Sequence, residues 1–349
     1  RQRQMCIRDS FNPFFASSIA AFKPVKPDPT IATSQSSGGS PLTEIGKYES
    51  HQKGFSLKLL EKISIYYYSH GMQKYSIFSL IKNAINHHTD WKPVWRYPEP
   101  KDTYDVIIIG GGGHGLATAY YLAKEHNITN VAIVEKGWIG GGNVGRNTTI
   151  LRSNYMHDEN GLFYEKGMDL WKSMSQDLNF NVMYSPRGII NLAHSDAQMN
   201  VYSRRGNSMR LNGIDAVLLN REEVKKLVPQ LDFSENVRFP IFGGLMQPSG
   251  GTARHDAVAW GYARQADSMG VDIIQHCEVT GFDVVNGKIK GIKTSKGNIK
   301  AKKIGLCVAG STSVLAEMLN MTLPVETHLL QACVSEPIKP ILDLSLIHI

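Results

Sequence analysis

Three glycines near residue 110 have the spacing of a turn that binds a pyrophosphate. Gly110, Gly112 and Gly115 follow the pattern G-x-G-x-x-G. The first glycine allows a tight turn, the second lets the backbone approach the phosphates, and the third lets helix and strand pack closely. The amides at the start of the following helix would point at the phosphates. The pattern predicts a dinucleotide-binding turn, and an ordinary glycine-rich turn is the alternative.

An acidic residue lies at the distance from this turn that dinucleotide binding requires. Glu135 follows about 20 positions after the glycines, and its carboxylate can accept both hydroxyls of a ribose. This favours an unphosphorylated AMP moiety over the 2′-phosphate of NADP. The glycine pattern does not distinguish a site for NAD from a site for FAD. The glycine-rich stretch over residues 135–155 can wrap an extended FAD or form a flexible surface loop.

The elements around these residues predict a βαβ unit. Residues 105–109 are a β-branched apolar run typical of a buried parallel strand, residues 116–126 have helical character, and residues 131–134 form a second apolar run. Further along we expect a helix from the capping box of Asn220 and Glu223 to Pro229. The other expected elements are a helix over residues 255–270, a hairpin over 279–294 and a strand over 303–308.

Composition excludes several classes of protein. With 349 residues, 42% of them hydrophobic, the chain has enough apolar material for a large core or two domains. No apolar run approaches the ~18 residues of a membrane helix, so a soluble protein is expected. The cysteines predict neither a metal site nor a disulfide framework and fit a reducing cytoplasm, because no C-x-x-C pair occurs among Cys6, Cys277, Cys307 and Cys333.

The positive charge is concentrated outside the part that is expected to fold. The whole chain has 38 Lys and Arg residues and 31 Asp and Glu residues. Residues 1–71 hold nine of the basic residues and five of the acidic ones, which leaves a net charge of 29 − 26 = +3 for the rest of the chain. A nucleic-acid partner is therefore not expected.

Residues 1–71 are predicted to be a disordered or foreign extension before a true start at Met72, with a transit peptide as the alternative. Residues 344–349 are expected to be a foreign tail without a partner strand.

Several segments resemble one family of flavoenzymes. The β subunit of heterotetrameric sarcosine oxidase, among the D-amino-acid-oxidase-like FAD-dependent oxidoreductases, is similar to the chain over residues 72–343. The likeness rests on YDVIIIGGGGHGLATAYYLAKEHNITNVAIVEKGWIGGGNVGRNTTILRSNY, SQDLNFNVMYSPRGIINLAH and GGTARHDAVAWGYARQADSMGVDIIQHCEVTGF. The lead-in from Met72 and the segment LLQACVSEPIKPILD also match.

The resemblance implies an α/β fold, with a Rossmann-like FAD-binding domain and a second, mostly antiparallel-sheet substrate domain. The FAD-binding parts would be residues 103–182 and 247–317, interleaved with substrate-domain parts 183–246 and 318–343. The family's C-terminal glycine-rich segment and lysine have no counterpart before Ile349. We therefore expect a C-terminally truncated chain that is inactive alone.

The resemblance also implies a reaction. Sarcosine would be oxidised by hydride transfer to noncovalent FAD, and electrons would pass through a covalent FMN to dioxygen. The products would be hydrogen peroxide, glycine and either formaldehyde or methylenetetrahydrofolate. The partners would be the alpha, gamma and delta subunits of a cytoplasmic complex. A NAD-dependent dehydrogenase and a non-catalytic flavoprotein subunit are the alternatives.

The resemblance assigns roles to individual residues. Arg152 would grip the substrate carboxylate with its guanidinium fork, with a solvated surface arginine as the alternative. His255 would carry the FMN through an imidazole nitrogen, with a packed histidine at a helix start as the alternative. The FAD contacts would be Gly110, Gly112, Gly113, His114, Gly115, Glu135, Lys136, Gly142, Asn147, Thr148, Val279, Ala309 and Gly310. For Val279 and Ala309 the alternative is strand packing.

Overall fold

The computed structural model describes residues 77–87, 89, 93–234, 236–329, 331, 336, 342 and 344–347. The described residues fall into two compact units, one before residue 94 and one from residue 94 onward. In the first unit the described residues form α3 (Ile77–Ile85). The prediction of a disordered extension over residues 1–71 concerns residues outside the described ranges.

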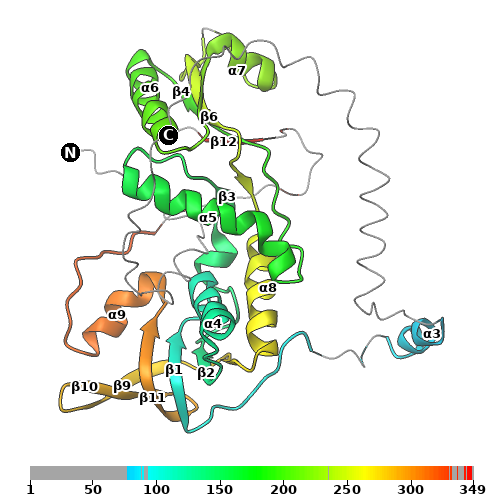
Figure 1. The fold of residues 1–349 in the computed structure, drawn as a ribbon, viewed down its shortest axis with the longest axis vertical. Helices are drawn as coiled ribbons and strands as arrows, with labels where there is room; N and C mark the ends of the chain where they lie inside the picture. Colours follow the sequence, from blue (N-terminus) through cyan, green and yellow to red (C-terminus); the bar gives the residue numbers. More distant parts are fainter. Residues whose placement is uncertain are drawn as a thin grey trace, which may run out of the picture. The chain divides into compact units, whose positions relative to one another are not determined.

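A six-stranded mixed sheet supports the glycine turn (Figure 1). Its order is β8 (Asp272–Ile274), β2 (Val131–Val134), β1 (Thr103–Ile109), β11 (Gly297–Leu306), β10 (Lys288–Thr294) and β9 (Val279–Val285). The pairs from β8 to β11 are parallel, and the pairs from β11 to β9 are antiparallel. Helix α4 (Gly113–His126) connects β1 to β2, which confirms the predicted βαβ unit.

Strand β11 differs from its predicted limits of residues 303–308. It begins at Gly297 and ends at Leu306, so Cys307 and Val308 follow it. The early part was missed because buried Ile299 and Ala301 alternate with exposed lysines, the pattern of a strand with one solvated face. The predicted hairpin is confirmed as β9 and β10, joined by Asn286 and Gly287, both with positive φ.

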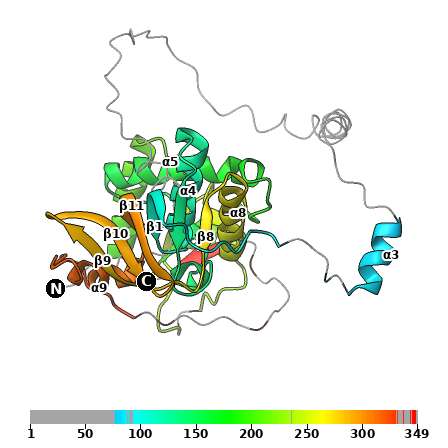
Figure 2. The ribbon, with the colours of Figure 1, turned by 90° about the horizontal axis from the view of Figure 1, so that it is seen from below.

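The two faces of the large sheet pack into separate cores. Ile108 and Ile133 pack in the core that also holds residues of α4 and α8 (His255–Ser268), and Figure 2 shows these helices together on one side of the strands. Ile107 and Val134 face the opposite way, into a core that includes Leu315 of α9 (Thr312–Glu317). Because neighbouring residues of a strand point to opposite faces, burial of both faces explains the continuous apolar runs of β1 and β2.

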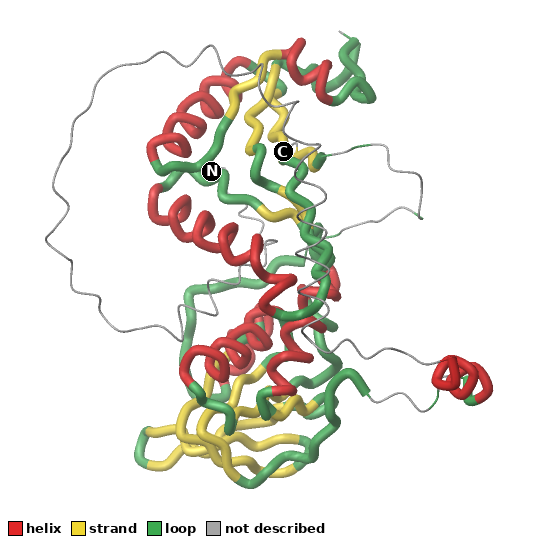
Figure 3. The backbone as a smooth tube through the Cα atoms, turned by 45° about the vertical axis from the view of Figure 1, so that its right-hand side comes forward, coloured by secondary structure: helices red, strands yellow, loops and turns green. Residues whose placement is uncertain are grey.

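A second sheet has the order β12 (Ser345–Ile347), β4 (Ile189–Ala193), β6 (Gly243–Gln247) and β5 (Val217–Asn220). Figure 3 shows it well separated from the large sheet within residues 94–349. The pairs β4–β6 and β6–β5 are antiparallel, which confirms the expected second sheet. Helices α6 (Asp196–Leu211) and α7 (Arg221–Leu227) contact it. The capping box predicted at the start of α7 is present, and α7 ends two residues before Pro229.

The expectation that the last residues lack a partner strand is wrong. β12 pairs in parallel with β4, with Ser345 opposite Ile189. The free backbone groups at the edge of β4 provide the hydrogen-bond partners that a short apolar segment needs. The limits proposed for the two domains remain predictions.

The remaining elements connect the sheets. They are η1 (Asn143–Arg146), β3 (Ile150–Leu151), α5 (Asp158–Asp177), β7 (Gly251–Thr252) and η2 (Ala309–Ser311). Among the described residues, no helix combines the length and the apolar character needed to cross a membrane.

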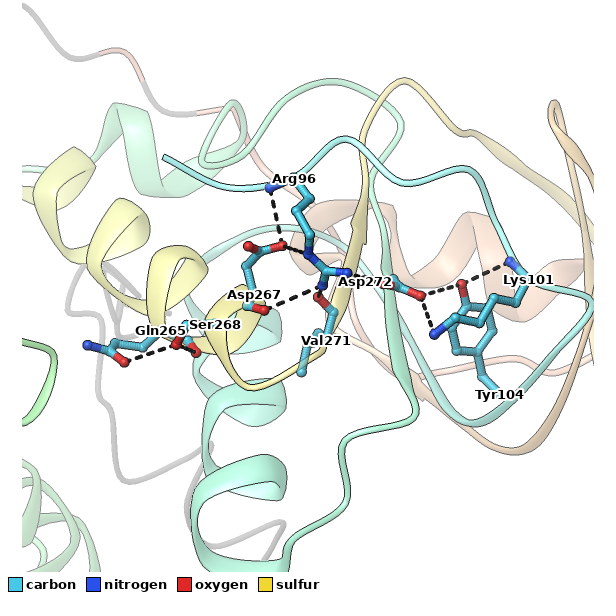
Figure 4. Close-up of polar contacts among 8 residues, drawn as sticks. All are labelled: Arg96, Lys101, Tyr104, Gln265, Asp267, Ser268, Val271 and Asp272. Carbon is cyan, nitrogen blue, oxygen red and sulfur yellow. Dashed lines mark hydrogen bonds and ion pairs between the residues drawn. The ribbon is translucent and has the colours of Figure 1, made fainter. Parts of the chain in front are cut away.

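A polar cluster fixes the segment that leads into β1 (Figure 4). Asp272 is only 1% exposed, and its carboxylate lies 2.7 Å from Lys101 Nζ, 3.4 Å from Arg96 Nη1 and 3.1 Å from the donating hydroxyl of Tyr104. Arg96 also pairs with Asp267 at 2.9 Å. Burial raises the pKa of Tyr104 to about 12, so its hydroxyl remains a donor at neutral pH. The cluster ties residues 96–104 to the edge of the large sheet.

Candidate functional site

The three glycines of the turn are required for different reasons. Gly110 has φ +108°, and a Cβ there would lie 2.4 Å from the Cys307 carbonyl oxygen. A Cβ on Gly115 would lie 2.0 Å from the Gly110 carbonyl oxygen, so helix and strand pack too closely for any side chain. A Cβ on Gly112 would meet only Val144 Cγ2, at 3.9 Å. The fold thus requires Gly110 and Gly115, whereas the space beside Gly112 is open to a ligand.

The parallel strands bring several predicted residues to one edge of the sheet. β1, β2 and β11 run in the same direction, so the residues after their carboxyl ends lie at the same edge. Gly110, Glu135 and the exposed pair Ala309 and Gly310 follow these three ends. The side chain of Val279 is buried in the core on the α9 side of the sheet, and the contact of its backbone with FAD stays a prediction.

Glu135 has structural partners of its own. Its Oε2 accepts a hydrogen bond from the amide of Gly111 at 2.7 Å, and its Oε1 accepts one from the amide of Gly137 at 2.8 Å. A carboxylate oxygen has two acceptor sites, so each still has one for a ribose hydroxyl. The carboxylate therefore both holds the glycine turn to the next loop and fits the predicted ribose contact.

The loop after Glu135 lies against the glycine turn. The amide of Gly140 donates to the Gly111 carbonyl oxygen at 3.0 Å. Both ends of the Asn147 amide are used within the loop, donating to the Val144 carbonyl at 2.8 Å and accepting from the Thr149 amide at 2.7 Å. Asn147 therefore shapes the loop. Four other predicted contact residues are exposed, namely His114, Lys136, Gly142 and Thr148.

A buried polar network positions the segment around Arg152. Ser153 donates its amide to Gln247 Oε1 at 3.0 Å, and Gln247 Nε2 donates to the Ser153 hydroxyl at 2.6 Å. Asn154 Nδ2 donates to Asn191 Oδ1 at 2.6 Å. These four polar residues are at most 2% exposed. They connect the end of β3 to β4 and β6, so the backbone of Arg152 is held by the second sheet.

The Arg152 side chain is half-buried and has few partners. Nη1 donates to Asn154 Oδ1 at 3.3 Å, and the guanidinium lies 5.5 Å from the ring centre of Tyr155. The Tyr155 ring stacks on Tyr164 at 4.2 Å, which fixes the aromatic surface under the cation. No ion pair joins Arg152 to a described carboxylate. Most of its five donors are therefore available to a carboxylate ligand.

Sequence reasoning missed a second arginine near Arg152. Arg205 and Tyr202 lie one turn apart on α6, with the Arg205 guanidinium 5.4 Å from the Tyr202 ring centre. Burial raises the pKa of Tyr202, whereas the positive charges of Arg205 and Arg152 lower it. No motif distinguishes Arg205 in the sequence. The only local signal is its spacing of three residues from Tyr202, which is common in helices.

His255 is the first residue of α8, as predicted, and it is half-buried. It lines a cavity of about 20 Å³ together with Trp171 and Val258, and its buried Nδ1 has no hydrogen-bond partner in the part of the chain that the structure describes. That volume holds about one water molecule. β3 pairs with β7, which ends three residues before His255, so the Arg152 and His255 segments are neighbours.

Two glycines precede His255 by a few residues, Gly250 and Gly251. Neither Gly250 nor Gly251 has a positive φ. A Cβ on Gly251 would lie 2.2 Å from the Ser185 carbonyl oxygen, and one on Gly250 would lie 2.8 Å from Ile189 Cδ1. These positions need glycine because other segments approach the backbone closely.

Three comparisons place the chain among known proteins. It is 60% identical over 270 residues to sarcosine oxidase subunit beta of Rhizobium meliloti (strain 1021), covering 77% of this chain and 65% of that protein. It is 53% identical over 272 residues to the subunit of the same name from Rhodobacter capsulatus, covering 78% and 66%. The crystal structure of L-proline dehydrogenase from P. horikoshii superposes with a TM-score of 0.59 at 27% identity, covering 63% of this chain and 57% of that one.

The chain thus spans about two thirds of the length of the curated relatives it matches. The family model for FAD dependent oxidoreductases matches residues 105–347, which include the glycine turn, Arg152 and His255. The open space beside Gly112 and the remaining acceptor sites of Glu135 fit the FAD that this family binds. The chain belongs to the FAD dependent oxidoreductase family.

Proposed function

We propose that this chain is the subunit of a sarcosine oxidase that binds and oxidises sarcosine. The observation that carries the proposal is the 60% identity over 270 residues to a sarcosine oxidase subunit beta, a level at which site geometry and chemistry are both expected to be retained. The products would be glycine, hydrogen peroxide and formaldehyde or methylenetetrahydrofolate. The complex would be cytoplasmic and would contain alpha, gamma and delta subunits.

Residues of this chain would bind both the cofactor and the substrate. Amides of the glycine turn would hold the pyrophosphate of FAD, and Glu135 would bind its ribose. The bound flavin would supply a two-electron acceptor. Arg152 would fix the substrate carboxylate through its fork, because its donors are held in one plane and most are not used within the described chain. This contact would orient the methylamino group for oxidation.

His255 is proposed to carry the covalent FMN. Its buried Nδ1 has no hydrogen-bond partner among the described residues, so this ring nitrogen is not engaged within the described chain. The adjoining cavity has room for about one water, so the FMN ring would lie outside it. A flavin that remains with the polypeptide after acid precipitation, on a peptide containing Arg254, His255 and Asp256, would support this assignment.

The test is an anaerobic titration of the flavin-loaded complex with sarcosine. FAD absorbs near 450 nm, a property of the flavin that nicotinamide lacks, and its absorbance should fall as sarcosine is added. A complex without flavin would favour the NAD-dependent alternative. A flavin that sarcosine does not bleach would favour the non-catalytic subunit.

Arg152→Ala gives a second test in the same complex. It should leave the flavin spectrum unchanged and weaken sarcosine binding by about 2 to 4 kcal/mol, because a bidentate charge-assisted contact is lost. Unchanged saturation by sarcosine would reject the role of Arg152.

A further inference from the structure

Two arginines from distant parts of the sequence share one polar region. Arg152 follows β3, and Arg205 lies on α6. A residue in contact with each arginine is hydrogen-bonded to β4, at the consecutive residues Asn191 and Leu192. Asn154, which accepts from Arg152, also bonds Asn191, and the hydroxyl of Tyr202, whose ring contacts Arg205, donates to the Leu192 carbonyl at 3.2 Å. The second sheet therefore holds the two guanidinium groups in the same neighbourhood.

Arg205 is a poorly compensated cation. Among the described residues, its buried Nε has no hydrogen-bond partner and no carboxylate forms an ion pair with it. The Tyr202 ring, 5.4 Å from the guanidinium carbon, is its identified favourable contact. Burial, with a further contribution from the positive charge of Arg152, lowers the pKa of Arg205. Because arginine keeps its charge in proteins, this environment costs free energy rather than removing the proton.

An anion bound between the two arginines would remove this cost. A planar carboxylate has two oxygens with about four acceptor sites, enough to accept from two guanidinium groups. We propose that Arg205 is a second binding residue for the substrate carboxylate, acting with Arg152 to select a small amino acid over its neutral analogues. This inference rests on the proposed function, because it places the same carboxylate that Arg152 is proposed to bind.

The proposal explains how the site could reject neutral ligands. A neutral amide presents one carbonyl oxygen and an NH₂ group, and it leaves two neighbouring cations uncompensated. Charged donors that are left without partners cost free energy. The site therefore discriminates strongly against neutral ligands even where its affinity for the carboxylate is modest. Arg205 would therefore contribute to discrimination between sarcosine and its amide.

The test uses the complete flavin-loaded complex and three variants on one helix. Arg205→Met removes the charge and keeps much of the aliphatic volume, and Arg205→Lys keeps the charge without the fork. Arg204→Met is the matched control, because Arg204 is the adjacent residue on α6 and is exposed. Anaerobic flavin reduction at increasing concentrations of sarcosine or sarcosine amide gives a dissociation constant and a limiting reduction rate for each ligand.

For Arg205→Met we expect the dissociation constant for sarcosine to rise roughly 10- to 100-fold, the loss of one or two hydrogen bonds to a charged group. The constant for sarcosine amide should change less than about threefold, and the FAD spectrum should not change. The dissociation constant of Arg205→Lys for sarcosine should lie between those of Arg205→Met and the wild type, and that of Arg204→Met should match the wild type.

Two results would overturn the inference. Equal weakening of sarcosine and its amide would show that Arg205 only supports the fold of the site. Wild-type sarcosine affinity in Arg205→Met would show that the carboxylate does not reach it. Failure of the wild-type complex to be reduced by sarcosine is a separate outcome that would reject the proposed function itself and this inference with it.

Discussion

Gly112→Ala separates what the ligand requires of the glycine turn from what the fold requires. Gly112 has φ −81° and ψ −179°, an extended conformation open to alanine. The new Cβ would meet no atom closer than Val144 Cγ2 at 3.9 Å, an ordinary contact. Alanine is a poorer helix N-cap than glycine but has less freedom in the unfolded chain, and these effects are each about 0.5 to 1 kcal/mol and oppose each other. Stability should change by less than about 1 kcal/mol.

The same methyl group should strongly weaken FAD binding. A phosphate oxygen that accepts from a backbone amide lies about 2.9 Å from the nitrogen, a distance that needs the unobstructed backbone of glycine. Hydrogen bonds to charged groups contribute about 1.5 to 3 kcal/mol each. Loss of one or two of them would cost about 2 to 4 kcal/mol, or roughly 30- to 1,000-fold in the dissociation constant of FAD.

The assay is titration of flavin-depleted protein with FAD, followed by quenching of flavin fluorescence, with thermal unfolding of the same samples. Gly115→Ala and Gly305→Ala are the reference variants. The first places a Cβ 2.0 Å from the Gly110 carbonyl oxygen and should destabilise the protein without ligand, whereas the second meets no atom within 4 Å and should alter neither property. Wild-type FAD affinity in Gly112→Ala would refute the assignment of the pyrophosphate to this turn.

Three further predictions concern named contacts. Asp272→Asn should lower the free energy of unfolding by about 1 to 3 kcal/mol, because Arg96 and Lys101 lose a buried anion but are themselves half-exposed. The control Asp102→Asn, at an exposed residue, should change the free energy of unfolding by less than about 0.5 kcal/mol. Equal urea midpoints for the two variants would contradict this prediction. Glu135→Gln should lower the melting temperature even without FAD, because one backbone amide loses its acceptor, and an effect seen only with FAD would disprove the structural role. His255→Ala should abolish acid-stable flavin and retain releasable FAD, and acid-stable flavin in this variant would show that another residue carries the FMN.

The local parts of this fold could be predicted from the amino-acid sequence. The glycine spacing, the apolar runs of β1 and β2, the capping box of α7 and the Asn286-Gly287 turn all depend on residues close together in the chain. Backbone freedom, side-chain periodicity and end capping act over a few residues, so their patterns predict elements directly. The resemblance extended these patterns to a two-sheet architecture.

Long-range packing determines which predicted residues have room for a ligand and which side chains meet. The pairing of β12 with β4 depends on the free edge of β4, which cannot be predicted from the sequence of residues 344–349. The two amide contacts of Glu135 and the burial of His255 Nδ1 likewise come from segments that approach in space. Asn154 beside Arg152 and Tyr202 beside Arg205 come to the same strand only because the folded chain bonds both residues to β4. Charge compensation is a property of everything around a group, so an arginine on a helix acquires its role only once the chain has folded.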